Sequence, residues 1–248
     1  MVSTSTADDN QYPNFCEQAA ANDDVFKNFK TSSVYTRILE HVNYQQGLQY
    51  YKFFKHNKLI IDNLEKFKIN DKYGSPKLSN YDFGLFSPST LRYIKVLSDL
   101  TQTKLDGKDI VEIGCGYGGQ YTTIRQLFKP KSYTFIDLAP VNKLIKKYIK
   151  KLNLDDIEIN FYNNNDLPNI KADLVISNYA ISECIKEVQD VYIENVVNNC
   201  KKGYITHNSN VSGPKYTQKE FLNLVKHNIK EHPELPKTGQ HNVLYIWS

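Results

Sequence analysis

The stretch that decides the fold is KDIVEIGCGYGGQYTTI, which runs from Lys108 to Ile124. An apolar run ends there in four closely spaced glycines, and a segment of helical character follows. Glycine at such a turn lets the backbone adopt positive φ and pass close to a ligand. Because Gly114, Gly116 and Gly119 satisfy G-x-G-x-x-G, the turn taken alone fits a dinucleotide-binding fingerprint.

Downstream of this turn, short apolar runs alternate with helical segments. Strands are expected at 110–113, 133–136, 157–162, 174–176 and 203–206, and helices at 119–128, 140–152, 188–200 and 218–227. Alternation at this spacing predicts βαβ units and a parallel sheet. The tail IKEHPELPKTGQHNVLYIW (229–247) predicts two further strands joined by a polar loop, which would close the sheet as an antiparallel hairpin.

The first part of the chain has a different pattern. Residues 1–22 are polar and are expected to be disordered or frayed. Residues 23–104 carry apolar side chains at helical spacing, so we expect a helical cover, interrupted at 71–84 by a loop rich in turn formers. Residues 105–248 then form the ligand-binding domain.

Composition excludes several classes of protein. The net charge is only +4 with both signs spread along the chain, so neither a nucleic-acid nor a membrane partner is expected. The basic segment VNKLIKKYIKKL (141–152) could suggest RNA, but a solvated helix face is the commoner explanation. The four cysteines show no metal or disulfide spacing, which indicates a reducing, cytoplasmic setting. No metal site is expected, with a divalent ion held by Glu183 and nearby oxygens as the alternative. The oligomeric state stays open, and a homodimer is one expectation.

Glu112, the helical half that precedes the motif and the lack of a second glycine-rich turn shift the balance away from a dinucleotide, whereas Asp137 fits either cofactor. Glu112 lies inside the expected strand, two positions before Gly114, where a carboxylate can reach the ammonium group of an amino acid moiety. Asp137 follows the next strand and could accept hydrogen bonds from two ribose hydroxyls, or cap the helix that begins near Pro140. No second glycine-rich turn follows downstream. Because the glycine spacing still fits a dinucleotide, an NAD-dependent sugar dehydrogenase remains the alternative enzyme.

These motifs resemble those of the class I S-adenosylmethionine-dependent methyltransferases. VEIGCGYGG resembles their first motif, FIDL (135–138) their second strand, and DLVISNYAISE (173–183) their fourth. YGSP (73–76), SPSTLRYIKVLSDL (87–100) and KGYITHN (202–208) narrow the resemblance to a family of sugar O-methyltransferases. The resemblance implies a Rossmann-like, seven-stranded, mostly parallel sheet with an antiparallel C-terminal strand. It also implies S-adenosylmethionine as cofactor and a sugar hydroxyl, on a nucleotide-linked or glycan sugar, as acceptor.

The resemblance also implies a set of cofactor-binding residues. The glycines would lie against the methionine part, and Asn164, with Asn165 or Asp166 as alternatives, would meet the adenine. The implied set is Glu112, Gly114, Cys115, Gly116, Tyr117, Gly118, Asp137, Leu138, Asn164 and Asn178.

A sugar hydroxyl needs a base to remove its proton. Glu183, His207 and His241 follow expected strands at the edge where ligands bind, so each is a candidate catalytic base. Each also has a structural alternative, Glu183 as a first-turn helix acid and the histidines as satisfied polar loop residues. The candidate substrate-binding residues are Tyr179, Gln189 and Tyr73. A non-catalytic scaffold that binds S-adenosylmethionine is the remaining alternative.

Overall fold

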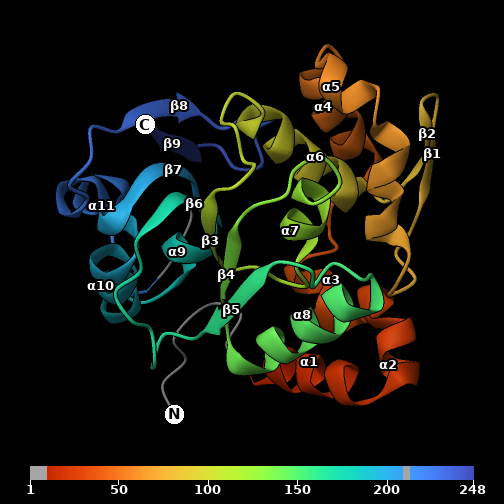
Figure 1. The fold of residues 1–248 in the computed structure, drawn as a ribbon, viewed down its shortest axis with the longest axis horizontal. Coiled ribbons are helices and arrows are strands. Elements are labelled where there is room, and N and C mark those ends of the chain that lie inside the picture. Colours follow the sequence, from red (N-terminus) through yellow and green to blue (C-terminus); the bar gives the residue numbers. More distant parts are fainter. Residues whose placement is uncertain (1–9, 209–212) are drawn as a thin grey trace.

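The computed structural model describes residues 10–208 and 213–248 (Figure 1). Seven strands form one sheet in the order β5-β4-β3-β6-β7-β9-β8. Their bounds are β3 Asp109–Ile113, β4 Ser132–Ile136, β5 Glu158–Tyr162, β6 Ala172–Asn178, β7 Cys200–His207, β8 Lys230–Pro233 and β9 Val243–Trp247. The first five are parallel to one another, and β9 pairs antiparallel with both β7 and β8. The predicted α/β, Rossmann-like sheet with an antiparallel C-terminal strand is confirmed.

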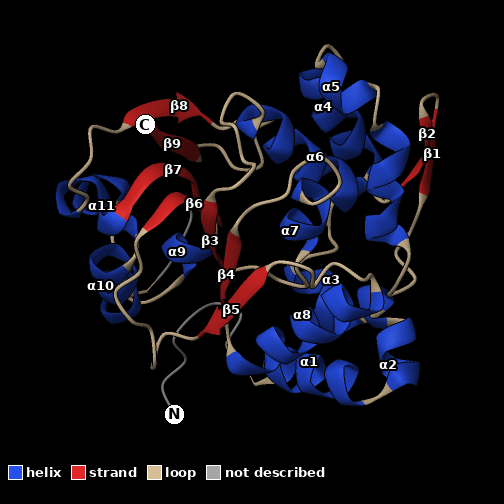
Figure 2. Ribbon diagram, viewed as in Figure 1, coloured by secondary structure: helices blue, strands red, loops and turns tan. Residues whose placement is uncertain are grey.

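Helices cover both faces of the sheet, as Figures 1 and 2 show. One face carries α6 Pro88–Leu100, α7 Gly119–Ile124 and α8 Ala139–Lys151, and the other carries α10 Lys186–Asn195 and α11 Gln218–Leu224. Side chains of a strand alternate between the faces, so Ile110 packs with the first group while Val111 packs with the second. None of the helices in the described ranges is both long and apolar enough to cross a bilayer.

The N-terminal cover is helical, as its periodicity predicts. Its helices are α1 Gln11–Ala21, α2 Asp23–Lys27, α3 Ser33–Ile38, α4 Tyr44–Phe54 and α5 Lys58–Ile61, with 3₁₀ segments η1 Phe29–Thr31 and η2 Leu64–Asp71. Within the segment expected to be a loop, β1 Ser79–Tyr81 and β2 Gly84–Phe86 pair as an antiparallel hairpin.

The prediction that residues 1–22 are frayed is wrong for 10–22, and residues 1–9 lie outside the described residues. Helix α1 packs against α8, with Tyr12, Cys16 and Ala19 buried. These three residues recur at helical spacing, so one apolar stripe holds an otherwise polar segment on the domain.

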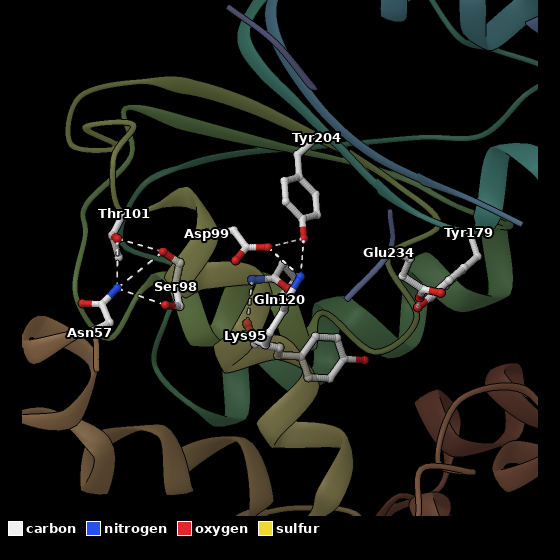
Figure 3. A network of polar contacts seen from close by, with 10 residues as sticks. Asn57, Lys95, Ser98, Asp99, Thr101, Gln120, Tyr179, Tyr204 and Glu234 are labelled. Carbon is white, nitrogen blue, oxygen red and sulfur yellow. Dashed lines mark hydrogen bonds and ion pairs between the residues drawn. The ribbon is translucent and has the colours of Figure 1, made fainter. Parts of the chain in front are cut away.

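Helix α6 joins the cover to the sheet through polar contacts at several points along its length (Figure 3). Lys95 forms an ion pair with Asp99 at 2.7 Å, and the Tyr204 hydroxyl on β7 donates to the same carboxylate oxygen at 2.7 Å. The Nε2 of Gln120 on α7 donates to the Tyr93 carbonyl at 3.3 Å. These contacts fix α6 against both α7 and the sheet.

Candidate active site

A cavity of about 430 Å³ lies at the carboxyl edge of the parallel strands. This is the edge where open α/β sheets bind their ligands, and the volume falls within the usual range for small-molecule sites. Its walls come from the glycine turn, from the ends of β4 and β6, from the segment that leads into α10, and from the N-terminal cover.

The glycine turn approaches neighbouring segments too closely for any side chain. Gly114 has φ +77°, and a Cβ there would lie 2.0 Å from the Cβ of Ala180. Gly116 has φ +57°, and a Cβ there would lie 2.7 Å from Leu39 of the cover. Since positive φ and lack of space coincide, only glycine keeps this backbone open toward the cavity.

Asp137 lies directly after β4, and its carboxylate holds the glycine turn. Oδ2 accepts the backbone N–H groups of Cys115 at 2.7 Å and Gly116 at 3.0 Å, while Oδ1 accepts that of Leu138 at 2.8 Å. Burial raises the pKa of Asp137 to about 6, and these amides oppose the rise. A carboxylate offers about four acceptor positions, so room remains for a ligand hydroxyl.

Glu112 projects from β3 on the face that also carries Ile110. It is 2% exposed, and the Tyr133 hydroxyl on β4 donates to its Oε2 at 2.6 Å. Burial raises the pKa of Glu112 to about 8, although the Tyr133 hydrogen bond opposes this. A buried carboxylate that lines a cavity favours a cationic ligand group beside it.

Tyr179 and Glu183 lie beyond β6, on the far side of Glu112 from Asp137. Tyr179 adopts φ +70°, a costly conformation for a bulky residue, and its hydroxyl donates to the Glu234 carboxylate. Glu183 lies at the end of α9 Ala180–Glu183, where burial raises its pKa while Lys215 and a hydrogen bond with Asn208 lower it.

Several predicted site residues line this one cavity. The lining includes Glu112, Gly114, Cys115, Gly116, Asp137, Leu138, Asn164, Asn178, Tyr179 and Glu183.

The other predicted site residues lie elsewhere. The Lys30 ammonium lies over the Tyr117 ring, 3.8 Å from its centroid, and Gly118 is the N-cap residue of α7 with φ +85°. The Tyr73 hydroxyl donates to the carbonyl of Lys151, the last residue of α8, at 3.2 Å. These positions shape the turn or anchor the cover, and they lie outside the cavity lining.

Gln189 and the two histidines also lie off the cavity. The buried Gln189 donates through Nε2 to the Cys184 carbonyl at 2.8 Å. His207 is 1% exposed, packs on Phe221 and Tyr245 on the α11 side of the sheet, and burial lowers its pKa to about 4. His241 is exposed on the loop between β8 and β9.

The sequence analysis named His241 in the last loop, but it missed the residues of that loop and of the cover that line the cavity. Cover residues in the lining include Tyr12, His41, Gln46, Tyr50, Arg92 and Tyr93, and the β8–β9 loop adds Thr238, Gly239 and Asn242. For Arg92 and Tyr93 of the cover, the one signal in the sequence was the family resemblance of the segment 87–100, which contains both. Within the described ranges, no group of three or more His, Cys, Asp or Glu residues is arranged to hold a metal ion.

Comparison with family models gives no match. A phthiotriol/phenolphthiotriol dimycocerosates methyltransferase of Mycobacterium leprae is 37% identical over 86 residues, which are 34% of this chain and 31% of that protein. The similarity thus spans about a third of the length of this curated relative.

Solved structures of similar arrangement are also found. An S-adenosylmethionine-dependent methyltransferase from Clostridium acetobutylicum is 13% identical with a TM-score of 0.49, over 61% of this chain and 87% of that one. One from Aquifex aeolicus is 17% identical with a TM-score of 0.47, over 62% and 87%. Because these identities and TM-scores are low, the fold assignment rests on the strand order and register of the sheet itself.

Proposed function

We propose that this chain is an S-adenosylmethionine-dependent methyltransferase that acts on a sugar hydroxyl, on a nucleotide-linked or glycan sugar. The observation that carries the proposal is the convergence of the glycine turn, Glu112, Asp137 and Glu183 on one cavity at the carboxyl edge of the sheet. The resemblance of the sequence motifs supports the sugar as acceptor.

The residues of the cavity fit the proposed cofactor. S-adenosylmethionine carries an ammonium and a sulfonium, and Glu112 is a buried carboxylate that such a cation would stabilise in its ionised form. Gly114 and Gly116 let the backbone pass against the methionine part. Asp137 keeps an acceptor position for a ribose hydroxyl, and Asn164 lies in the wall where the adenine is expected.

For the proposed reaction, the protein must align the methyl donor with the acceptor hydroxyl and supply a base that removes the hydroxyl proton. When bound, the cofactor supplies a methyl group already activated on sulfur, so holding donor and acceptor in line provides much of the rate. Glu183 is our candidate base, because it lines the cavity and its raised pKa makes it a stronger proton acceptor than an exposed glutamate. Asn178 and Tyr179 would then orient the cofactor and the acceptor.

The test combines cofactor binding with turnover. A panel of nucleotide sugars is incubated with protein and methyl donor, and methylated products are detected by mass spectrometry. Glu183→Gln should lower turnover by about 100-fold or more while the affinity for S-adenosylhomocysteine stays unchanged. His207→Gln and His241→Gln are the matched variants, and full activity of Glu183→Gln would show that the base lies elsewhere.

The same assays separate the alternatives. The G-x-G-x-x-G spacing with Asp137 also suits an NAD-dependent sugar dehydrogenase, which would oxidise the sugar and reduce the nicotinamide with a change in absorbance. A non-catalytic scaffold would bind S-adenosylhomocysteine and show no turnover with any acceptor.

A further inference from the structure

Arg92 places a positive charge in the cavity wall. Its guanidinium carbon lies 5.4 Å from the centroid of the Tyr93 ring, and the phenols of Tyr50 and Tyr179 and the imidazole of His41 lie near it in the same wall. Within the described part of the chain, no carboxylate forms an ion pair with Arg92.

Two other shielded cations of this protein have carboxylate partners, whereas the buried Lys30 donates to the Asn70 carbonyl at 2.6 Å and lies over the Tyr117 ring, away from the cavity. Lys95 pairs with Asp99 at 2.7 Å, and Arg125 pairs with Asp156 at 2.6 Å. A charge withdrawn from water is costly unless an opposite charge or a set of acceptors faces it. The position of Arg92 in a cavity wall therefore suits a ligand that brings the negative charge.

Arg92 shares the cavity wall with Tyr179, the residue that follows β6. Across the edge β4-β3-β6, Asp137 follows β4, Glu112 lies on β3 and Tyr179 follows β6. Tyr179, whose hydroxyl donates to Glu234, and Tyr50 of α4 line the same cavity and lie near the Arg92 guanidinium. It thus belongs to the β6 side, away from the end at which Asp137 holds the glycine turn.

The backbone of Arg92 is held firmly. The next residue, Tyr93, accepts a hydrogen bond from Gln120 through its carbonyl at 3.3 Å (Figure 3). About one and two turns further on, Lys95 and Asp99 bind the Tyr204 hydroxyl of β7. A charge presented from a fixed helix loses little freedom when a ligand binds, which favours affinity.

We propose that Arg92, with Tyr50 beside it, binds a carboxylate or phosphate of the methyl acceptor, so that the acceptor is an acidic sugar derivative. This inference rests on the proposed function and names its substrate class. The planar guanidinium matches carboxylate and phosphate with two parallel hydrogen bonds. A neutral sugar offers only hydroxyl groups, which do not need a guanidinium.

The test measures binding of glucose, glucuronate and glucose 1-phosphate by saturation-transfer NMR, with S-adenosylhomocysteine at saturation. At least one of the two acids should bind and glucose should not, and the stronger acid identifies the anion as carboxylate or phosphate. Arg92→Gln should weaken binding of that acid by about tenfold or more, and Arg92→Lys by less. Lys150→Gln removes an exposed charge of α8 and should change nothing.

This inference would be overturned by equal binding of glucose and both acids, by binding of neither acid, or by unchanged binding of the acid to a folded Arg92→Gln. Loss of S-adenosylhomocysteine affinity in Arg92→Gln would also overturn it, because Arg92 would then serve the carboxylate of the cofactor. If the intact protein binds no S-adenosylhomocysteine, the proposed function itself fails, which calorimetry without any sugar distinguishes.

Discussion

The carboxylate of Asp137 accepts the backbone N–H of Cys115 at 2.7 Å, and so joins the end of β4 to the glycine turn after β3. A second amide, that of Gly116, donates to the same oxygen at 3.0 Å. The residue that the sequence motif assigns to a ribose therefore also fixes the loop against which the cofactor is proposed to lie.

This contact predicts that Asp137→Asn loosens the glycine turn in the ligand-free protein. Because the asparagine side chain is neutral and carries a donor in place of one oxygen, all three backbone N–H groups lose a charged acceptor and at least one loses its acceptor altogether. Hydrogen exchange of a peptide that contains Cys115 and Gly116 should become faster. Asp155→Asn, an exposed change, is the control, and equal exchange in both variants would contradict this role.

Gly114 and Gly107 both have positive φ, but only Gly114 has a close neighbour, so Gly107 serves as its control. Gly107 has φ +67°, and a Cβ there would meet nothing within 4 Å, so Gly107→Ala should cost only the backbone strain, about 1–2 kcal/mol. Gly114→Ala adds the 2.0 Å clash with Ala180, and should cost about 1–3 kcal/mol more. Urea unfolding measures both changes.

A double variant isolates the clash. Ala180→Gly removes the Cβ that Gly114→Ala meets, so the two changes together should recover part of the lost stability. Strict additivity of the two single effects would show that Ala180 does not limit the turn.

Glu112 predicts a pH dependence of stability. Its pKa is raised by burial to about 8, from 4.5 for an exposed glutamate. Between these values the folded protein holds a proton that the unfolded chain has released, so the free energy of unfolding falls as pH rises. The stability from this protonated group is complete below pH 4.5 and is lost as pH rises through about 8.

Glu112→Gln should remove this dependence. Urea midpoints of the intact protein and of the variant are compared between about pH 6.5 and pH 8, a window above the pKa of about 6 of Asp137. The intact protein should lose stability over that window relative to the variant. Tyr133→Phe removes the hydrogen bond that lowers the pKa of Glu112, and should move the loss to higher pH. Parallel profiles for the intact protein and Glu112→Gln would contradict the assignment.

The contact between Lys95, Asp99 and Tyr204 predicts that removing Asp99 and removing Lys95 lower the stability by different amounts. The Lys95 side chain is 9% exposed and that of Asp99 is 31% exposed. Asp99→Ala leaves a shielded ammonium without its partner, whereas Lys95→Met leaves a carboxylate that water can reach. Asp99→Ala should therefore be the more destabilising change in urea unfolding, and the reverse order would refute this account of how α6 is held.

Much of the sheet could be predicted because parallel strands buried on both faces are short apolar runs between turn signals. The run from Ile110 to Ile113 and the alternation after it indicated the strands, and topology then brought their carboxyl ends to one edge. That edge placed Glu112, Asp137 and Glu183 in one cavity.

His207 shows where such reasoning stops. It does lie at the carboxyl end of β7, but alternation along the strand turns its ring toward α11 with Ile205, into the core beside Tyr245. The sequence indicates the edge of the sheet at which a residue lies more readily than the face to which its side chain points.

The cover was harder to predict because its contacts with the domain are distant in sequence. Tyr12 and Arg92 reach the cavity through the packing of α1 on α8 and of α6 on α7, which no local pattern specifies. The spacing of Tyr12, Cys16 and Ala19 was nevertheless a local signal that α1 is a packed helix.

The central claim is that the cavity holds S-adenosylmethionine, and titration calorimetry with S-adenosylhomocysteine tests it most directly. The account predicts saturable binding to one site, much weaker binding by Asp137→Ala, unchanged binding by Asp155→Asn, and no heat of binding with NADH. Absence of S-adenosylhomocysteine binding by the intact protein, or binding of NADH in its place, would contradict the claim.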